Sequence, residues 1–218
     1  MVDEIKIDRE LLIEKIRDAK KISRKRKFEQ SMELIITIKN LDLKKPENRM
    51  LLTFKLPRSL RKKRKICVFS EGPFAEEAKK LGADKVITKA MIEELAGKKR
   101  EIKKIAEEYD FFLAQPQLMG LIGKYFGFAL GPRGKMPSIV SDISQLKERI
   151  DTLRNSVRIH LRKNPEACCI IGTEKMDNES LAVNAMAVIS GVYNKIREKA
   201  KIGKIYVKTT MGKPVRVF

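Results

Sequence analysis

The sequence predicts an α+β domain built from both termini and interrupted by an inserted three-layer α/β domain of the Rossmann-like kind. Two observations favour this organisation. Positive charge is concentrated at the two ends, and only the middle of the chain alternates regularly between short apolar runs and helical patterns. We therefore expect the discontinuous domain to comprise residues 1–64 plus 155–218, and the inserted domain to comprise residues 65–154.

The charge distribution supports this division. The 218 residues include 48 Lys and Arg against 28 Asp and Glu, a net charge of +20. Residues 1–66 have 21 basic and 10 acidic side chains (+11), residues 67–152 have 14 and 13 (+1), and residues 153–218 have 13 and 5 (+8). Such a surplus favours a polyanionic partner, with nucleic acid the first candidate and an anionic membrane the second.

The first end of the chain predicts one helix and two strands. Residues 8–21 place Leu12, Ile16 and Ala19 on one helical stripe, and a basic tract at 24–27 follows. Strands are then expected at 32–38, where alternate residues are apolar, and at 50–54.

The middle predicts strands separated by helices, a pattern that implies parallel pairing. Gly72-Pro73 opens one of these helices, because a proline in the first turn loses no hydrogen bond. The expected strands are 65–69, 85–88 and 111–114, and the expected helices are 72–81, 91–109, 117–126 and 144–153.

The second end predicts strands near 157–162 and 167–172, a long helix from Asn178, and a final strand at 204–208. Neither end alone can bury both faces of such a sheet. Together they predict one domain with a single core.

The glycine-rich segment 119–137 has the composition of a phosphate loop but not the spacing of one. It matches neither GxGxxG nor GxxxxGK[ST], because Gly134-Lys135 is followed by Met136. We expect tight turns around 131–134 instead, with Arg133 and Lys135 presenting charge at the edge of the domain. A nucleotide-binding enzyme on the α/β insertion stays open as an alternative.

Metal and redox chemistry have little support. Cys67, Cys168 and Cys169 form no CxxC pair and lie in apolar runs, so buried thiols are expected. His160 is the only histidine, with no evident catalytic partner. The sequence therefore predicts no enzyme, no cofactor and no metal.

No apolar stretch is long enough to span a membrane, and the first residues are acidic, so we expect a cytoplasmic protein without a membrane partner.

Three segments are candidates for contact with RNA. Phe28 and Ser31 follow four consecutive cations, which suits stacking and a bond to a ribose 2′-OH, although Phe28 is equally well explained as a core residue. In the segment 208–214, threonine hydroxyls, Met211 and Gly212 suit the same chemistry, and an ordinary turn is the alternative. The basic run 58–65 fits phosphate contact, an interdomain hinge or both.

Several motifs together resemble one known family. They are Gln115-Pro116 with Met119-Gly120 and Gly123-Lys124, the run Leu-Gly-Pro-Arg-Gly-Lys-Met-Pro at 130–137, Lys27-Phe28, and Thr-Thr-Met-Gly at 209–212. The chain resembles the L-one family, the universal first protein of the large ribosomal subunit and the protein of its lateral stalk. It looks like the archaeal type, because Gly212-Lys213-Pro214-Val215 departs from the Gly-Pro-Gly-Val of bacterial members.

The resemblance implies a structural protein, monomeric when free, whose terminal domain binds large-subunit ribosomal RNA while the inserted domain moves on a hinge. It also implies help in the movement and release of exit-site tRNA, and repression of translation through binding of the protein's own mRNA. A non-ribosomal RNA-binding regulator or assembly factor of the same fold is the alternative. The RNA-binding residues that the resemblance implies are Lys27, Phe28, Ser31, Glu33, Arg158, Lys163, Thr209, Thr210, Met211 and Gly212.

Overall fold

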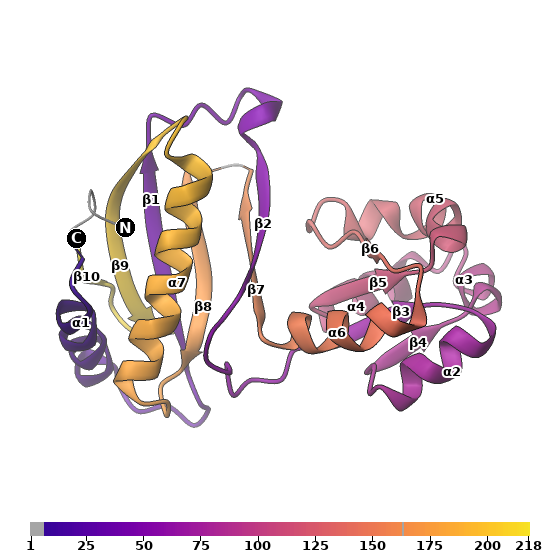
Figure 1. The fold of residues 1–218 in the computed structure, drawn as a ribbon, viewed down its shortest axis with the longest axis horizontal. Coiled ribbons are helices and arrows are strands. Elements are labelled where there is room, and N and C mark those ends of the chain that lie inside the picture. The colour runs from indigo at the N-terminus through magenta and orange to yellow at the C-terminus, as the bar shows by residue number, and fades with distance from the viewer. Residues whose placement is uncertain (1–6, 163) are drawn as a thin grey trace. The chain divides into compact units, whose positions relative to one another are not determined.

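The computed structural model describes residues 7–162 and 164–218 (Figure 1). It contains antiparallel sheets and one parallel sheet, so the mixed α and β content expected from the sequence is confirmed. The chain divides into two compact units. Unit 1 comprises Met1–Lys62 and Asn155–Phe218, and unit 2 comprises Lys63–Arg154.

Unit 1 is built on a four-stranded antiparallel sheet in the order β10-β9-β1-β8. Its strands are β1 (Ser31–Lys39), β8 (Glu166–Thr173), β9 (Lys201–Thr209) and β10 (Val215–Arg216). A separate antiparallel pair joins β2 (Met50–Lys55), which follows the 3₁₀ turn Pro46–Asn48, to β7 (Ser156–Leu161). The first strand of the chain thus lies between two strands from its other end.

Two helices pack against the buried face of the four-stranded sheet. In β1, Met32, Leu34 and Ile36 are buried, whereas the alternate residues are partly exposed, as the period of a strand requires. Helix α1 (Arg9–Ile22) contributes its predicted apolar stripe to this core, and α7 (Asn178–Ile196) lies along the sheet (Figure 1). Asp8 caps α1 and Asp177 caps α7 through side-chain bonds to backbone amides.

Unit 2 has a parallel sheet in the order β4-β3-β5-β6, covered by helices on both faces. Phe69 and Phe112 belong to the core on the side of α3, α4 and α5, whereas Val68 and Leu113 belong to the core on the side of α2 and α6. The strands are β3 (Ile66–Phe69), β4 (Lys85–Ile87), β5 (Phe111–Ala114) and β6 (Ser138–Ile139). The helices are α2 (Gly72–Lys80), α3 (Lys89–Glu94), α4 (Lys99–Glu108), the 3₁₀ turn Pro116–Leu118, α5 (Met119–Leu130) and α6 (Ile143–Arg154).

The structure differs from the sequence predictions in three places. The helix expected at 91–109 is two helices, because the chain turns at Gly97 with a positive φ of 89°. The short strands β6 and β10 were not expected at all. Cys168 is exposed, whereas Cys67 and Cys169 are buried as expected. Burial raises the pKa of the Cys67 thiol, so it stays protonated and unreactive.

Candidate nucleic-acid interface

The turn after β9 is fixed to the start of β1. Strands β1 and β9 are antiparallel, with Met32 opposite Thr209, so the residues before β1 and after β9 leave the sheet side by side. The amide of Ser31 donates to Oγ1 of Thr210 at 3.1 Å, and the amide of Thr210 donates to the carbonyl of Ser31 at 3.0 Å. These bonds bring together two segments that the sequence suggested as RNA-binding.

The hydroxyl groups of this turn are used within the protein. Thr209 is fully buried and its Oγ1 lies 2.8 Å from Oγ of Ser23. Thr210 also donates to the carbonyl of Ser31 at 3.3 Å, and Ser31 itself is buried. Thr209 therefore supports the turn from within the protein, and the backbone of Ser31 contributes to the same support.

Gly212 is required for packing of the turn. Its amide donates to the carbonyl of Thr209 at 3.0 Å. A Cβ atom at this position would overlap the Thr209 hydroxyl. Packing within the protein therefore explains why a glycine is needed at position 212, whether or not a ligand approaches its backbone.

Gln30 connects four parts of unit 1. Its side-chain amide donates to Ser23 Oγ at 2.9 Å, to the carbonyl of Arg24 at 3.2 Å and to Glu174 Oε2 at 3.2 Å. Its Oε1 accepts from the amide of Met211 at 3.2 Å. Gln30 is only 1% exposed, so these bonds form away from bulk water. No pattern in the sequence indicates Gln30, because its partners are scattered along the chain.

The exposed residues around this network are large, apolar or cationic. Phe28 is 52% exposed and Met211 is 60% exposed, so the alternative that Phe28 is a core residue is excluded. Lys27 is exposed beside Phe28. We call these three side chains the Phe28–Met211 surface. An aromatic ring and a flexible thioether next to cations suit base stacking and phosphate contact.

Glu33 is neutralised by a cross-strand partner. It lies directly opposite Lys208 in the β1–β9 ladder, and Lys208 Nζ is 3.7 Å from Glu33 Oε2. Lys208 also donates to the carbonyl of Thr210 at 3.1 Å. The pair reduces the repulsion that an isolated carboxylate would exert on RNA.

The last two suggested residues are Arg158 and Lys163. Arg158 lies on β7 opposite Thr53, in the two-stranded sheet. Lys163 lies outside the described residues.

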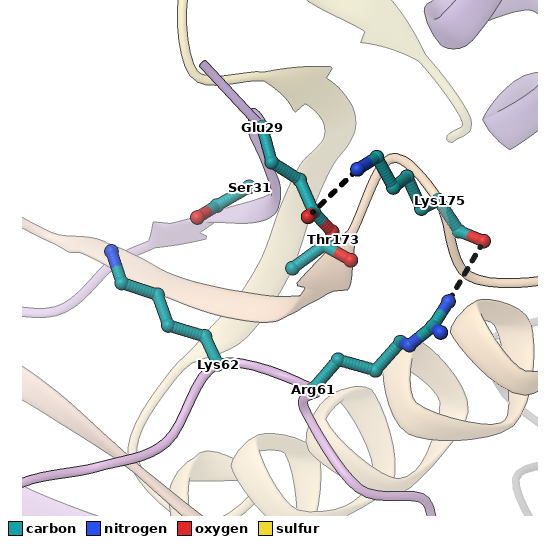
Figure 2. A pocket seen from close by; sticks show the side chains of 6 residues that line it. All are labelled: Glu29, Ser31, Arg61, Lys62, Thr173 and Lys175. Carbon is teal, nitrogen blue, oxygen red and sulfur yellow. Dashed lines mark hydrogen bonds and ion pairs between the residues drawn. The ribbon is translucent and has the colours of Figure 1, made fainter.

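A pocket of ≈400 Å³ opens beside the start of β1 (Figure 2). It is lined by Glu29, Ser31, Arg61, Lys62, Thr173 and Lys175. Hydrogen bonding with the Thr173 hydroxyl, and then the charge of Lys175, lower the pKa of the Glu29 carboxyl, so the carboxyl is ionised at neutral pH. The basic run had indicated Arg61 and Lys62, but Thr173 and Lys175 were missed.

The glycine-rich segment of unit 2 has a structural explanation. Residues 131–134 form turns, as expected. However, Lys135 donates to the carbonyls of Ala106 and Tyr109 at 2.8 and 2.7 Å, and Arg133 binds Glu107 at 2.6 Å. The sequence placed these two charges at the edge of the domain, and in the structure both cations are bound by groups of unit 2. Across residues 7–162 and 164–218, no three metal-ligating side chains cluster, and no helix is long and apolar enough to cross a membrane.

Comparison with known proteins identifies the family. The model of the Ribosomal protein L1p/L10e family matches residues 19–213, nearly the whole chain. The chain belongs to this family.

Membership of the L1p/L10e family confirms the resemblance and excludes the nucleotide-binding enzyme, because the family is structural. The chain is 44% identical to the large ribosomal subunit protein uL1 of Thermococcus kodakarensis, over 96% of this chain and 98% of the relative. It is 44% identical to uL1 of Archaeoglobus fulgidus, over 97% and 99%. It is 41% identical to uL1 of Pyrobaculum arsenaticum, over 97% and 95%. The archaeal type expected from residues 212–215 is thus confirmed.

Proposed function

We propose that the protein is a component of the large ribosomal subunit, in the cytoplasm, and that it binds large-subunit ribosomal RNA through unit 1. The uL1 relatives support the ribosomal assignment. The observation that carries RNA binding is the set of hydrogen bonds between Ser31 and Thr210, which joins the two segments of the Phe28–Met211 surface within the protein. A preformed surface loses little conformational entropy on binding.

The chemistry of this surface fits RNA better than an anionic membrane. Phe28 and Met211 are exposed singly beside hydrogen-bonding groups, and they do not form the wide apolar face of a membrane-binding helix. The tract Arg24–Lys27 supplies positive charge next to them. Stacking with flanking cations is the usual arrangement for unpaired bases.

We extend the proposal to the domains. Residues 1–64 plus 155–218 are the RNA-binding domain, and 65–154 are an inserted domain that moves on the hinge at 58–65 and 154–155. The same RNA-binding face represses translation by binding the protein's own mRNA, and the assembled stalk assists the release of exit-site tRNA. The free protein is a monomer.

Two experiments test the proposal. Filter binding should give tight complexes with a large-subunit RNA transcript and weak complexes with a small-subunit transcript of similar length. In cell extracts, the protein should sediment with mature large subunits. Sedimentation only with immature particles would instead favour an assembly factor, and absence from ribosomal fractions would favour a non-ribosomal regulator.

For translational repression, the leader of the protein's own mRNA should compete with the ribosomal transcript for a single site. Two RNAs bound at once by one protein would contradict a shared surface.

A further inference from the structure

We propose that the pocket lined by Glu29, Ser31, Arg61, Lys62, Thr173 and Lys175 binds one backbone phosphate of the RNA that occupies the neighbouring Phe28–Met211 surface. The inference rests on the proposed RNA binding of unit 1. It adds Glu29, Thr173 and Lys175, which the sequence motifs did not indicate, to Ser31 and the basic run 58–65, which they did.

Three segments of unit 1 form the pocket (Figure 2). Ser31 and Thr173 are directly opposite each other in the antiparallel β1–β8 ladder, so their positions are set by the sheet. Arg61 and Lys62 approach from the segment that ends the first of the two parts of unit 1. In Figure 2, Lys62 and Lys175 lie at different sides of the group formed by Glu29 and Thr173.

The lining has two positive charges in excess, from three cations and one carboxylate. Arg61 is held in place because its guanidinium donates to the carbonyl of Lys175 at 3.3 Å. The remaining N–H groups of a guanidinium are well suited to phosphate oxygens. Arg61 also has a positive φ of 57°, which is uncommon for a residue with a side chain.

The carboxylate of Glu29 forms an ion pair with Lys175. Lys175 Nζ lies 3.4 Å from Glu29 Oε2, and the Lys175 side chain is 68% exposed. Ion pairs this exposed contribute little free energy. An arriving phosphate can therefore take over the ammonium group, with Glu29 as a weak competitor.

The pocket adjoins the Phe28–Met211 surface through the backbone. Glu29 follows Phe28 in the chain, and the amide and carbonyl of Ser31 are bonded to Thr210 next to Met211. A phosphate in the pocket and a base on Phe28 can thus belong to one RNA strand.

The test measures affinity for the large-subunit RNA transcript over a series of KCl concentrations. A lysine that contacts phosphate contributes about one unit to the slope of log affinity against log salt. We expect Lys62→Gln and Lys175→Gln each to weaken binding about three- to tenfold and to reduce the slope by about one. Glu29→Gln should strengthen binding, because it removes the competitor for Lys175.

Lys201→Gln is the matched control. Lys201 is an exposed lysine of unit 1, but it pairs with Lys39 at the end of β1 far from Ser31. It should keep the wild-type slope. Thermal melts establish that each variant is folded.

The outcomes separate the two proposals. Suppose that the wild-type protein binds the transcript and that Lys62→Gln and Lys175→Gln have the same affinity and salt slope as Lys201→Gln. That result overturns the phosphate subsite and leaves RNA binding intact. Failure of the wild-type protein to prefer the ribosomal transcript overturns the proposed function and the subsite with it.

Discussion

The backbone amide of Met211 donates to the side chain of Gln30 at 3.2 Å, between residues 181 positions apart in the sequence. The same side chain bonds Ser23, Arg24 and Glu174. The buried side-chain amide of Gln30 therefore positions Met211 and the start of the basic tract relative to each other. We make five predictions, four about this part of unit 1 and one about the cap of α7.

Replacement of Gln30 should disrupt the Phe28–Met211 surface. Gln30→Ala leaves the amide of Met211 without its partner and removes one of the two bonds from Gln30 to the Glu174 carboxylate, at a cost of about 1–3 kcal/mol in unfolding free energy. RNA affinity should fall as well, because Met211 loses its support. Urea unfolding and filter binding measure the two effects, and Gln145→Ala, at an exposed glutamine in unit 2, should change neither.

A charge exchange tests whether Gln30 acts through Glu174. Gln30→Glu places two carboxylates together and should weaken RNA binding strongly. Adding Glu174→Gln restores a donor opposite the new carboxylate and should recover part of the loss. If the double variant binds no better than Gln30→Glu alone, the proposed pairing is not what positions the surface.

Truncation of the exposed apolar side chains should reduce affinity without affecting stability. Phe28→Ala and Met211→Ala remove groups that are 52% and 60% exposed, so the core is untouched. Loss of stacking on Phe28 should weaken RNA binding by about 1–3 kcal/mol, with the salt dependence unchanged because no charge is lost. Phe128→Ala, at a 42% exposed ring of unit 2, is the control. An equal loss at Phe128 would argue against a surface confined to unit 1.

The Thr210 hydroxyl can be compared with a near-duplicate at the far end of the same two strands. Thr37 Oγ1 accepts from the Lys204 amide at 2.6 Å and donates to its carbonyl at 3.0 Å, as Thr210 does with Ser31. Thr210→Val and Thr37→Val should both destabilise the fold by about 1 kcal/mol. Only Thr210→Val should weaken RNA binding, so equal RNA affinities of the two variants would remove Thr210 from the site.

The cap of α7 should make stability depend on pH in the acid range. The Asp177 carboxylate accepts from the amide of Ser180 at 2.7 Å, and hydrogen bonding to Ser180 lowers the pKa of Asp177 below its ordinary 3.8. A lowered folded-state pKa means that the carboxylate stabilises the protein above pH 3.8, and that this contribution is lost as pH falls through the folded value.

Asp177→Ala should therefore lower the melting temperature at pH 7, and its difference from wild type should shrink in acid. Asp177→Asn keeps a neutral capping side chain, so its melting temperature should exceed that of Asp177→Ala at every pH. A constant difference between wild type and Asp177→Ala across the acid range would show that the charge does not contribute.

Periodic features of the sequence were sufficient for much of the fold. The alternation in 32–38 and the stripe through Leu12 and Ile16 predicted β1 and α1, because burial of one face is a local property of the pattern. The break at Gly97 was missed because helical spacing continues on both sides of it. Cys168 was placed inside by composition, although neighbouring residues of a strand face opposite sides and one of the two adjacent cysteines had to point outward.

The candidate site was less predictable because its bonds join distant segments. Basic and glycine-containing motifs indicated Phe28 and Met211, but nothing local distinguishes Gln30 from any other glutamine. Lys135 was expected to present its charge at the edge of the domain, because nothing in its loop indicates that it would donate to the carbonyls of Ala106 and Tyr109. Whether a polar side chain faces outward or satisfies the backbone depends on tertiary contacts.

The central position of β1 also constrains when the protein can become active during its synthesis. Ser31 pairs with Thr173, and Met32 pairs with Thr209, so the partners of β1 follow it by 142 and 177 residues in the sequence. Both neighbours of β1 therefore leave the ribosome long after β1 does, with unit 2 made in between. A truncated nascent chain lacks β9 and the turn that follows it, so it cannot assemble the Phe28–Met211 surface. The proposed binding of RNA at this surface must therefore wait until β9 and the turn that follows it have been synthesised.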